Sequence, residues 1–241
     1  MQTTDNILSQ VRAALAHNAH LDPVAHPVEI NVATRCVTLA GEVPGIAAKR
    51  LAAAAAAAIE GVDDVDDRLR IVPTASLGDG AIRDAVCKWL ARDVDFHNCT
   101  LRVFDSGRLQ VLRDGGEDSS GAIDIAVEDG VITLRGHVIS LSHKRLAGVL
   151  AWWSRGCRDV VNLLDLKPAE EDSDAEIIEA LRLVFETDPL VHPEQIAIAS
   201  RDYVVTLKGI VGTEEERRQA ELDAWYLHGV RRVINEIEAR P

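Results

Sequence analysis

The sequence predicts an α+β fold of three tandem α-β-β-α-β units, each a three-stranded mixed sheet covered by two helices. Three observations lead to this prediction. A hydrophobic-Thr-Leu-x-Gly pattern occurs three times, a second glycine follows each first glycine after 20 residues, and an apolar helical stripe precedes each copy. The first glycines are Gly41, Gly136 and Gly209, and the second ones are Gly61, Gly156 and Gly229. Spacing that is kept three times indicates an internal repeat.

Each copy begins with apolar residues at positions i, i+4 and i+8, which is the pattern of one buried helical face. The three stripes are Ile7, Val11 and Leu15; Ile82, Val86 and Leu90; and Ile177, Leu181 and Phe185. Alternating apolar residues, a polar turn and the Thr-Leu pattern follow each stripe, so we expect two antiparallel strands. The clearest hairpin signal is Asp129-Gly130.

A second helix is expected to begin about four residues after the first glycine, at Gly45, Ser140 and Thr213. It should end at the second glycine, which suits a left-handed cap. One face of this helix carries two alanines four residues apart, so it can lie close against a sheet. These alanines are Ala52, Ala147 and Ala220, and Ala56, Ala151 and Ala224. A final alternating segment predicts a third strand.

The middle copy carries an insertion between its first helix and its first strand. Leu101–Phe104 and Leu109–Leu112 flank the polar segment Asp105–Arg108, which predicts an added hairpin at about 93–121. Gly115–Gly121 is expected to be a flexible tether. The expected domains are 1–72, 78–168 and 172–241. Units of ~70 residues are near the lower size limit for independent stability, so contacts between copies are expected to add to it.

Composition and charge exclude some classes of protein. The 241 residues include 39 acidic and 26 basic side chains, a net charge of −13, so a nucleic-acid partner is not expected. The first 20 residues lack an apolar stretch behind a basic start, so no signal peptide is expected. The poly-alanine run Leu51–Ile59 is far shorter than the roughly 20 residues of a membrane-spanning helix. We therefore expect a soluble cytoplasmic protein.

No pattern of catalytic or metal-binding residues stands out. The cysteines form no CxxC pair and are interpreted as reduced core thiols, with Cys99 in the insertion the least constrained. His17, His20 and His26 fit no metal-binding helical spacing and are interpreted as surface histidines. The chain has no GxSxG motif and no phosphate-binding glycine loop. We expect no enzyme activity, no cofactor and no metal site.

The repeated residues resemble the BON domain, a bacterial family named after osmotically induced and nodulation-specificity proteins. The resemblance rests on the hydrophobic-Thr-Leu-x-Gly-x-Val pattern, the alanine-bearing helix and Gly-x-x-x-Val-x-Asn at Gly156–Asn162 and Gly229–Asn235. Asp188–Val191 adds to it in the third copy, whereas the first copy has Asp67 in place of the asparagine. The resemblance implies a non-catalytic protein associated with phospholipid or membrane surfaces and with envelope or osmotic stress; many members are periplasmic.

A pair of basic residues recurs at one place in each second helix. The pairs are Lys49 with Arg50, Lys144 with Arg145, and Arg217 with Arg218. They are candidates for binding phosphate head groups or acidic partners. The alternative is a solvated helix face whose charges are satisfied by nearby acids such as Glu214.

Aromatic residues at the end of the middle copy's second helix are further candidates. Trp152 and Trp153 stand beside Arg155, a combination that suits a membrane interface or a protein partner. The alternative places one ring in the core and leaves the other partly covered. Residues 73–168 hold 12 basic and 13 acidic residues, against 8 and 17 in residues 169–241, so an anionic surface should prefer the middle copy.

The first functional hypothesis is a non-enzymatic binding protein of tandem BON-like domains that acts at a phospholipid or membrane surface or in envelope stress. The alternative is a self-associating protein–protein interaction scaffold in the cytoplasm that binds no lipid. The expected partners are thus an anionic phospholipid surface or a protein, including a homo-oligomer.

Overall fold

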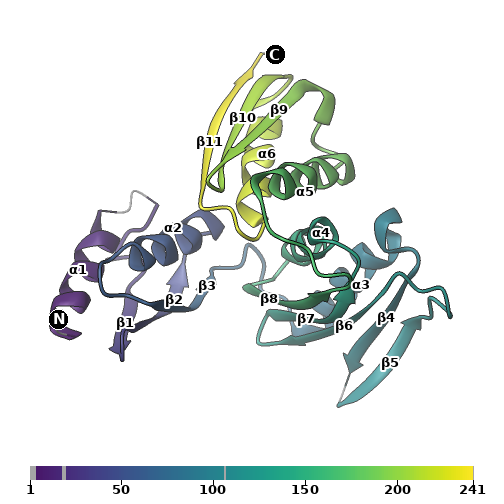
Figure 1. Ribbon diagram of the computed structural model, residues 1–241, viewed down its shortest axis with the longest axis horizontal. Coiled ribbons are helices and arrows are strands. Elements are labelled where there is room, and N and C mark those ends of the chain that lie inside the picture. The colour runs from purple at the N-terminus through teal and green to yellow at the C-terminus, as the bar shows by residue number, and fades with distance from the viewer. Residues whose placement is uncertain (1–3, 18–19, 106, 241) are drawn as a thin grey trace. The chain divides into compact units, whose positions relative to one another are not determined.

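A computed structural model describes residues 4–17, 20–105 and 107–240 of the chain. The chain divides into two compact units, Met1–Val72 and Pro73–Pro241, which are described in turn. Figure 1 gives the order of their elements. No helix among the described residues is long and apolar enough to cross a membrane.

The first unit has the predicted α-β-β-α-β order. Its elements are α1 (Thr4–Ala16), β1 (Val28–Ala33), β2 (Cys36–Val43), α2 (Ile46–Ala57) and β3 (Asp64–Ile71). The sheet order is β1-β2-β3, with β1 antiparallel and β3 parallel to the central β2. The predicted α1 stripe of Ile7, Val11 and Leu15 is buried in the core. This confirms the mixed three-stranded sheet expected from the sequence.

The second unit holds the other two copies. The middle copy consists of α3 (Asp79–Arg92), η1 (Val94–Phe96), β4 (Cys99–Asp105), β5 (Arg108–Arg113), β6 (Gly121–Glu128), β7 (Val131–Val138), α4 (Leu141–Trp152) and β8 (Asp159–Leu166). The third copy consists of α5 (Asp174–Thr187), η2 (Pro193–Gln195), β9 (Ile196–Arg201), β10 (Val204–Val211), α6 (Glu214–Tyr226) and β11 (Arg232–Ala239). The third sheet has the order β11-β10-β9, with the same directions as the first.

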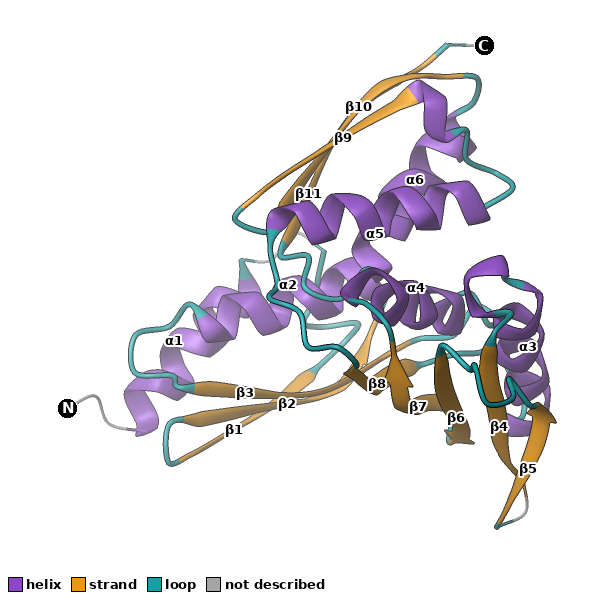
Figure 2. Cartoon of the chain, turned by 45° about the vertical axis from the view of Figure 1, so that its right-hand side comes forward, coloured by secondary structure: helices purple, strands orange, loops and turns teal. Residues whose placement is uncertain are grey.

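The predicted insertion in the middle copy is a hairpin, and it enlarges the sheet. β4 pairs parallel to β6 and antiparallel to β5, which gives five strands in the order β5-β4-β6-β7-β8. Figure 2 shows β4 and β5 continuing the sheet on the side of β6 that faces away from β7. The unit predicted for this copy is therefore present with two added strands.

The loop after the hairpin corrects the expected flexible tether. The Ser119 hydroxyl donates to the carbonyl of Asn98 at 3.1 Å, and the Thr100 N–H donates to the same hydroxyl at 3.3 Å. The Gly115 N–H donates to the Thr100 hydroxyl at 3.1 Å. Because these bonds attach the loop to β4 and to the residue before it, Gly115–Gly121 is an anchored loop.

The first glycine of the repeat is required by a close approach of two backbones. Gly41, Gly136 and Gly209 all have positive φ angles. A Cβ atom on Gly209 would lie 2.0 Å from the Gln195 carbonyl oxygen, and one on Gly136 would lie 2.1 Å from that of Ala122. No side chain fits at such a distance, so the repeat keeps a glycine where the central strand meets its antiparallel neighbour.

The second helices begin where the sequence predicts, with Gly45, Ser140 and Thr213 as N-caps. They end three or four residues before the second glycine, which lies with positive φ in the turn to the last strand. The six matched alanines of these helices are fully buried against the sheets. The prediction of close helix-to-sheet packing is therefore confirmed.

The asparagine of the last strand joins that strand to the second helix. Asn162 donates through Nδ2 to the Lys144 carbonyl at 2.7 Å, and Asn235 donates in the same way to the Arg217 carbonyl at 3.1 Å. In the first copy Asp67 has no amide donor, and its carboxylate lies 3.1 Å from the Lys49 ammonium instead. The departure from the repeat thus replaces a hydrogen bond to the helix backbone with an ion pair to the helix side chain.

Replacing Gly209 with alanine should destabilise the second unit by about 2–4 kcal/mol, because the new methyl group meets a carbonyl oxygen and the backbone has positive φ. Urea unfolding followed by tryptophan fluorescence measures this unit alone, since all four tryptophans lie in it. Gly212→Ala is the matched control, because a Cβ there meets nothing within 4 Å. Equal stabilities for the two variants would contradict the close-approach argument.

Candidate functional site

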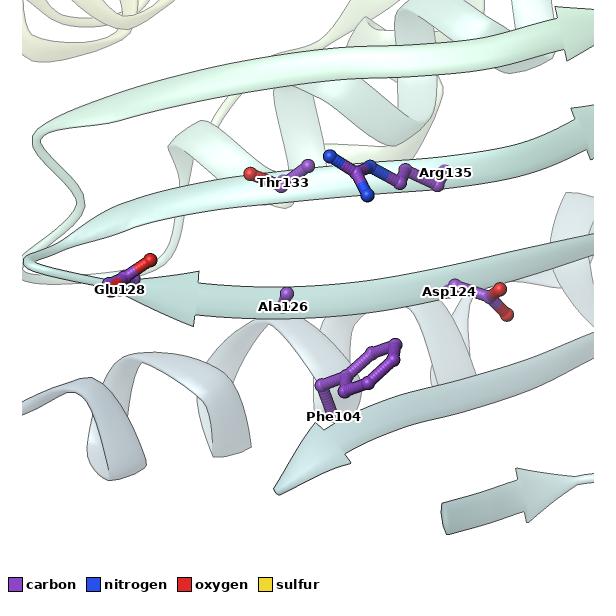
Figure 3. Close-up of a pocket in the computed structure, with 6 residues that line it drawn as sticks. All are labelled: Phe104, Asp124, Ala126, Glu128, Thr133 and Arg135. Carbon is purple, nitrogen blue, oxygen red and sulfur yellow. The ribbon is translucent and has the colours of Figure 1, made fainter. Parts of the chain in front are cut away.

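The open face of the middle sheet is the surface that distinguishes this copy from the other two. The helices α3 and α4 cover one face, where Leu101, Ile123 and Leu134 are buried. Side chains alternate along each strand, so the intervening residues point to the opposite face. A shallow cavity of about 420 Å³ lies on that open face (Figure 3). It is lined by Phe104, Asp124, Ala126, Glu128, Thr133 and Arg135.

Three adjacent strands supply the charged centre of this face. The Arg102 Nε donates to Asp124 Oδ1 at 2.5 Å, and the two residues are register partners on β4 and β6. Asp124 is in turn the register partner of Arg135 on β7. Asp124 therefore occupies the strand position between Arg102 and Arg135, and Arg135 is exposed at the cavity.

Apolar side chains border this charged centre on both sides. On one side Phe104 of β4 is 48% exposed and faces Leu109 of β5, its register partner, which is 42% exposed. On the other side Val161 and Leu163 of β8 are 38% and 50% exposed. They are register partners of Thr133 and Arg135 and so share the open face. The face combines accessible apolar groups with a small number of charges.

Three of the four equivalent positions in the other copies carry a charged residue. In the first copy Asp66 and Arg68 of β3 occupy the places of Val161 and Leu163 and form an ion pair at 2.7 Å. In the third copy Ile234 occupies the place of Val161, but Glu236 occupies the place of Leu163 and pairs with Lys208 of β10 at 2.7 Å. Only the middle copy therefore has apolar side chains at both positions.

The inserted hairpin is fixed to the body of the copy. Arg113 at the end of β5 donates from Nε to the Cys99 carbonyl and from Nη1 to the Ala91 carbonyl, both at 3.1 Å, and from Nη2 to the Phe96 carbonyl. Arg83 of α3 donates to Asp105 at the other end of the hairpin at 2.5 Å. These contacts hold both ends of the hairpin against α3 and η1.

Two of the six residues in the predicted basic pairs are buried. Lys49 is 4% exposed, and its ammonium donates to the Leu69 carbonyl at 2.5 Å as well as contacting Asp67. Arg145 is 2% exposed. Arg50, Lys144 and Arg217 are half-buried, and Arg218 is exposed. The interpretation of a uniformly solvated helix face is therefore wrong for Lys49 and Arg145, because these side chains cross into the space between elements.

Glu214 neutralises the third pair, as the sequence suggested. Its carboxylate accepts from Arg217 Nη2 at 2.7 Å and from Arg218 Nε at 3.1 Å. The hydrogen bond from Arg217, followed by the charges of both arginines, lowers the pKa of Glu214 to about 2. This acid therefore stays ionised, and both cations of the pair have a partner.

Arg145 connects the middle copy to the third copy. Its Nε donates to the His228 carbonyl at 2.9 Å, and its Nη2 contacts both carboxylate oxygens of Asp172, at 2.8 and 2.7 Å. Asp172 lies in the segment that joins the two copies, and His228 follows α6. The helix α4 that carries Arg145 is buried from Arg145 to Trp152, because the sheet covers one side and α5 covers another.

The predicted tryptophan pair lies at the same junction. The rings of Trp152 and Tyr226 stack at 5.6 Å, and Trp153 makes an edge contact with Trp89 at 5.2 Å. Trp152 is 6% exposed and Trp153 is half-buried, while Arg155 is exposed. The interpretation of one core ring and one partly covered ring therefore describes the pair.

An acid that the sequence reasoning missed is buried beside these rings. Asp223 of α6 is 0% exposed, and its Oδ1 accepts from Trp153 Nε1 at 2.9 Å and from Gln219 Nε2 at 3.1 Å. Burial first, and then the charge of Asp188, raise the pKa of Asp223 well above its usual value. The sequence does contain a signal for this residue. The other two copies have the apolar residues Ala55 and Leu150 at the matched positions, so an acid at position 223 departs from the repeat.

Two predictions about single residues have different outcomes. Cys99 is 2% exposed, so the prediction that it is the least constrained cysteine is wrong. The reason is that β4 lies between β5 and β6, and Cys99 faces the core. His17 and His20 are exposed and His26 is half-buried, in agreement with surface histidines.

The chain belongs to the BON domain family. The family model, described as BON domain, matches residues 3–73, 109–168 and 173–241, one match for each copy. The family is a non-catalytic binding domain associated with membrane or phospholipid binding and with stress. The middle match begins after α3 and β4, where the inserted hairpin interrupts the repeat.

Other known proteins add little. No curated protein matches the chain. Among solved structures it is similar to the C-terminal domain of CdsD, described as the structural protein of the Type III secretion system of Chlamydia trachomatis, at 14% identity over 100% of both chains. A second CdsD structure is 15% identical over 98% of this chain and 93% of the other. Both have a TM-score of 0.24.

Replacing Arg145 with methionine should lower the free energy of unfolding of the second unit by about 2–4 kcal/mol, because the Asp172 carboxylate and the His228 carbonyl lose their hydrogen-bond donor. Urea unfolding provides the measurement. Arg218→Met, at a side chain that is 73% exposed, should cost less than about 0.5 kcal/mol. If the two losses are equal, Arg145 does not hold the copies together.

The buried Asp223 should make the second unit less stable as pH rises. A carboxyl group with a raised pKa binds its proton more tightly in the folded state. Its stabilising contribution to the folded state is fully present below about pH 3.9, the pKa of the group in the unfolded chain. This contribution is lost as pH rises through the pKa of the group in the folded chain. Between these two pKa values the free energy of unfolding of the original protein should fall as pH rises. Asp223→Asn should make this fall less steep by up to about 1.4 kcal/mol per pH unit.

Chemical unfolding at a series of pH values tests this expectation. Asparagine keeps an acceptor for the Trp153 N–H, so the hydrogen bond at the junction is retained. Asp165→Asn, at an exposed acid of the same unit, is the matched control and should leave the pH profile as in the original protein. A profile for Asp223→Asn that parallels the original would contradict the burial argument.

Proposed function

We propose that this protein is a non-enzymatic protein-interaction module that binds its partner on the open face of the middle sheet. The supporting observation is the apolar border formed by Phe104, Leu109, Val161 and Leu163, at a face where the other copies carry ion pairs. Interface cores are depleted in charged residues and enriched in aromatic residues and arginine. Phe104, Arg135 and the aliphatic side chains of the border match this composition, and the charges of Arg102 and Asp124 at the centre of the face are paired with each other.

The contacts of the basic residues favour a protein partner over an anionic phospholipid surface. Binding to anionic lipid relies on accessible clusters of lysine and arginine. Of the nine residues predicted to bind a head group, only Arg155 and Arg218 are exposed, and Arg218 is paired with Glu214. The net charge of −13 adds repulsion from an anionic surface at distances within the Debye length of roughly 8 Å.

A binding role without catalysis fits the chemistry of the thiols. Burial raises the pKa of Cys87 to about 11, so this half-buried thiol stays protonated at neutral pH. Burial also raises the pKa of Cys157. Catalytic cysteines need the opposite shift, because the thiolate is the nucleophile. From the associations of the family, we infer that the binding serves adaptation to osmotic or envelope stress.

Co-sedimentation of the full chain with phospholipid vesicles tests the choice of partner. We expect no binding to neutral or to anionic vesicles, at low or at physiological salt. A Lys144→Glu/Arg155→Glu double variant should sediment like the original protein. Arg218→Glu is the control, because Arg218 lies in the third copy and is already paired with Glu214. Salt-sensitive binding to anionic vesicles that the double variant loses would overturn the proposal in favour of a lipid-binding role.

A further inference from the structure

The inserted hairpin leaves an unpaired and apolar sheet edge. β5 is the last strand of its sheet and pairs with β4 alone among the described strands. From Arg108 to Leu112 every residue is exposed, including Val111 at 62% and Leu112 at 46%. Sheet edges are usually protected by charged residues, proline, a bulge or a covering element. In β5 the charged residues Arg108 and Arg113 and the register shift against β4 lie at the ends of the strand, so Leu109–Val111 lack such protection.

The register of the hairpin determines which backbone groups point outward. Asp105 and Arg108 form the last pair, with two residues between them, and such a loop is closed by a hydrogen-bonded pair. Pairs alternate along an antiparallel ladder, so Gln110 also bonds to β4, whereas Leu109 and Val111 do not. The N–H and C=O groups of Leu109 and Val111 are therefore directed away from β4, toward the free edge.

These groups suit antiparallel pairing of β5 with β5 of a second copy of the chain. With a two-fold axis at Gln110, Leu109 lies opposite Val111 of the second copy, and Val111 lies opposite its Leu109. Both pairs use outward backbone groups and can exchange four hydrogen bonds in total. Both pairs also place apolar side chains side by side on the open face, next to Phe104 of each copy.

The charges along β5 are compatible with this register. Arg108 lies opposite Leu112 of the second copy, and Gln110 lies opposite Gln110, so no like charges face each other. Arg113 already donates to three carbonyl groups of its own chain. The strand is therefore complementary to itself in backbone polarity, in apolar pattern and in charge.

We propose that the protein forms a two-fold homodimer through antiparallel pairing of β5 strands, which joins two five-stranded sheets into one. The proposal goes beyond the proposed function, because the edge pairs whether or not the open face holds another partner. A short strand pair buries less than the ~1,200 Å² of most stable interfaces, so the dimer dissociates on dilution. Each chain of the dimer carries a net charge of −13, so added salt strengthens the dimer by screening the repulsion between the chains.

Sedimentation velocity of the full chain over a wide range of concentration tests the dimer. The mass should rise from the 26.2 kDa of one chain toward twice that value, and it should rise at lower concentration when salt is added. Val111→Lys should keep the chain monomeric by placing two cations at the interface. Val161→Lys is the matched control, because it puts the same change on the opposite edge strand of the same sheet and should leave the dimer intact.

Disulfide formation tests the register. Residues opposite each other in a non-hydrogen-bonded pair have Cα atoms about 4.5 Å apart, within the ~4.4–6.8 Å of disulfides. Oxidised Gln110→Cys should form a covalent dimer. Arg108→Cys should not, because its two thiols would be roughly 13 Å apart along the strands. Circular dichroism spectra like the original's show that the variants are folded.

Two results would overturn the proposal. A constant monomer mass at all concentrations would exclude pairing with a second chain. The partner of the β5 edge would then be a strand of another protein. A dimer that Val111→Lys does not weaken lies on another surface. Neither result bears on the vesicle experiment, which decides between lipid and protein as the class of partner, so the two proposals can fail independently.

Discussion

A two-layer unit of two helices and one sheet covers only one face of its sheet, and the rest of this structure depends on that limit. The buried face is filled by the repeated leucines, valines and alanines, which have the same places in all three copies. The three copies differ in the residues and contacts of their remaining surface. The first and third copies carry ion pairs on the open face, the third copy packs its helices against α4, and the middle copy has an apolar border.

The junction between the middle and third copies shows how polar groups are tolerated in a buried contact. Arg145 is paired with Asp172, and Asp223 accepts hydrogen bonds from Trp153 and Gln219. Their bonds offset much of the cost of removing a charge from water, and burial raises the pKa of Asp223, which favours its uncharged form. These side chains fix how α4 and α6 meet, so residues that resemble a ligand site in the sequence hold two domains together.

The middle copy combines a rigid platform with an accessible edge. Arg113, Arg83 and the loop around Ser119 attach the inserted hairpin to the body of the copy, so it keeps its position without a partner. Such preorganisation lowers the entropy cost of binding. The open face and the edge of β5 are neighbours and share Leu109, so a second copy at the edge would extend the surface available to another protein.

The sequence by itself determined the three copies, the helix stripes, the N-caps and the hairpin, because local periodicity and turn chemistry specify these features over short distances. It also located Lys49, Arg145, Trp152 and Trp153, but not what they contact. Only the tertiary structure decided that Arg145 reaches His228, that Asp223 is buried and that Phe104, Arg135 and Leu163 share one face. Such contacts join residues up to 83 positions apart or depend on strand register, and local pattern carries no information about either.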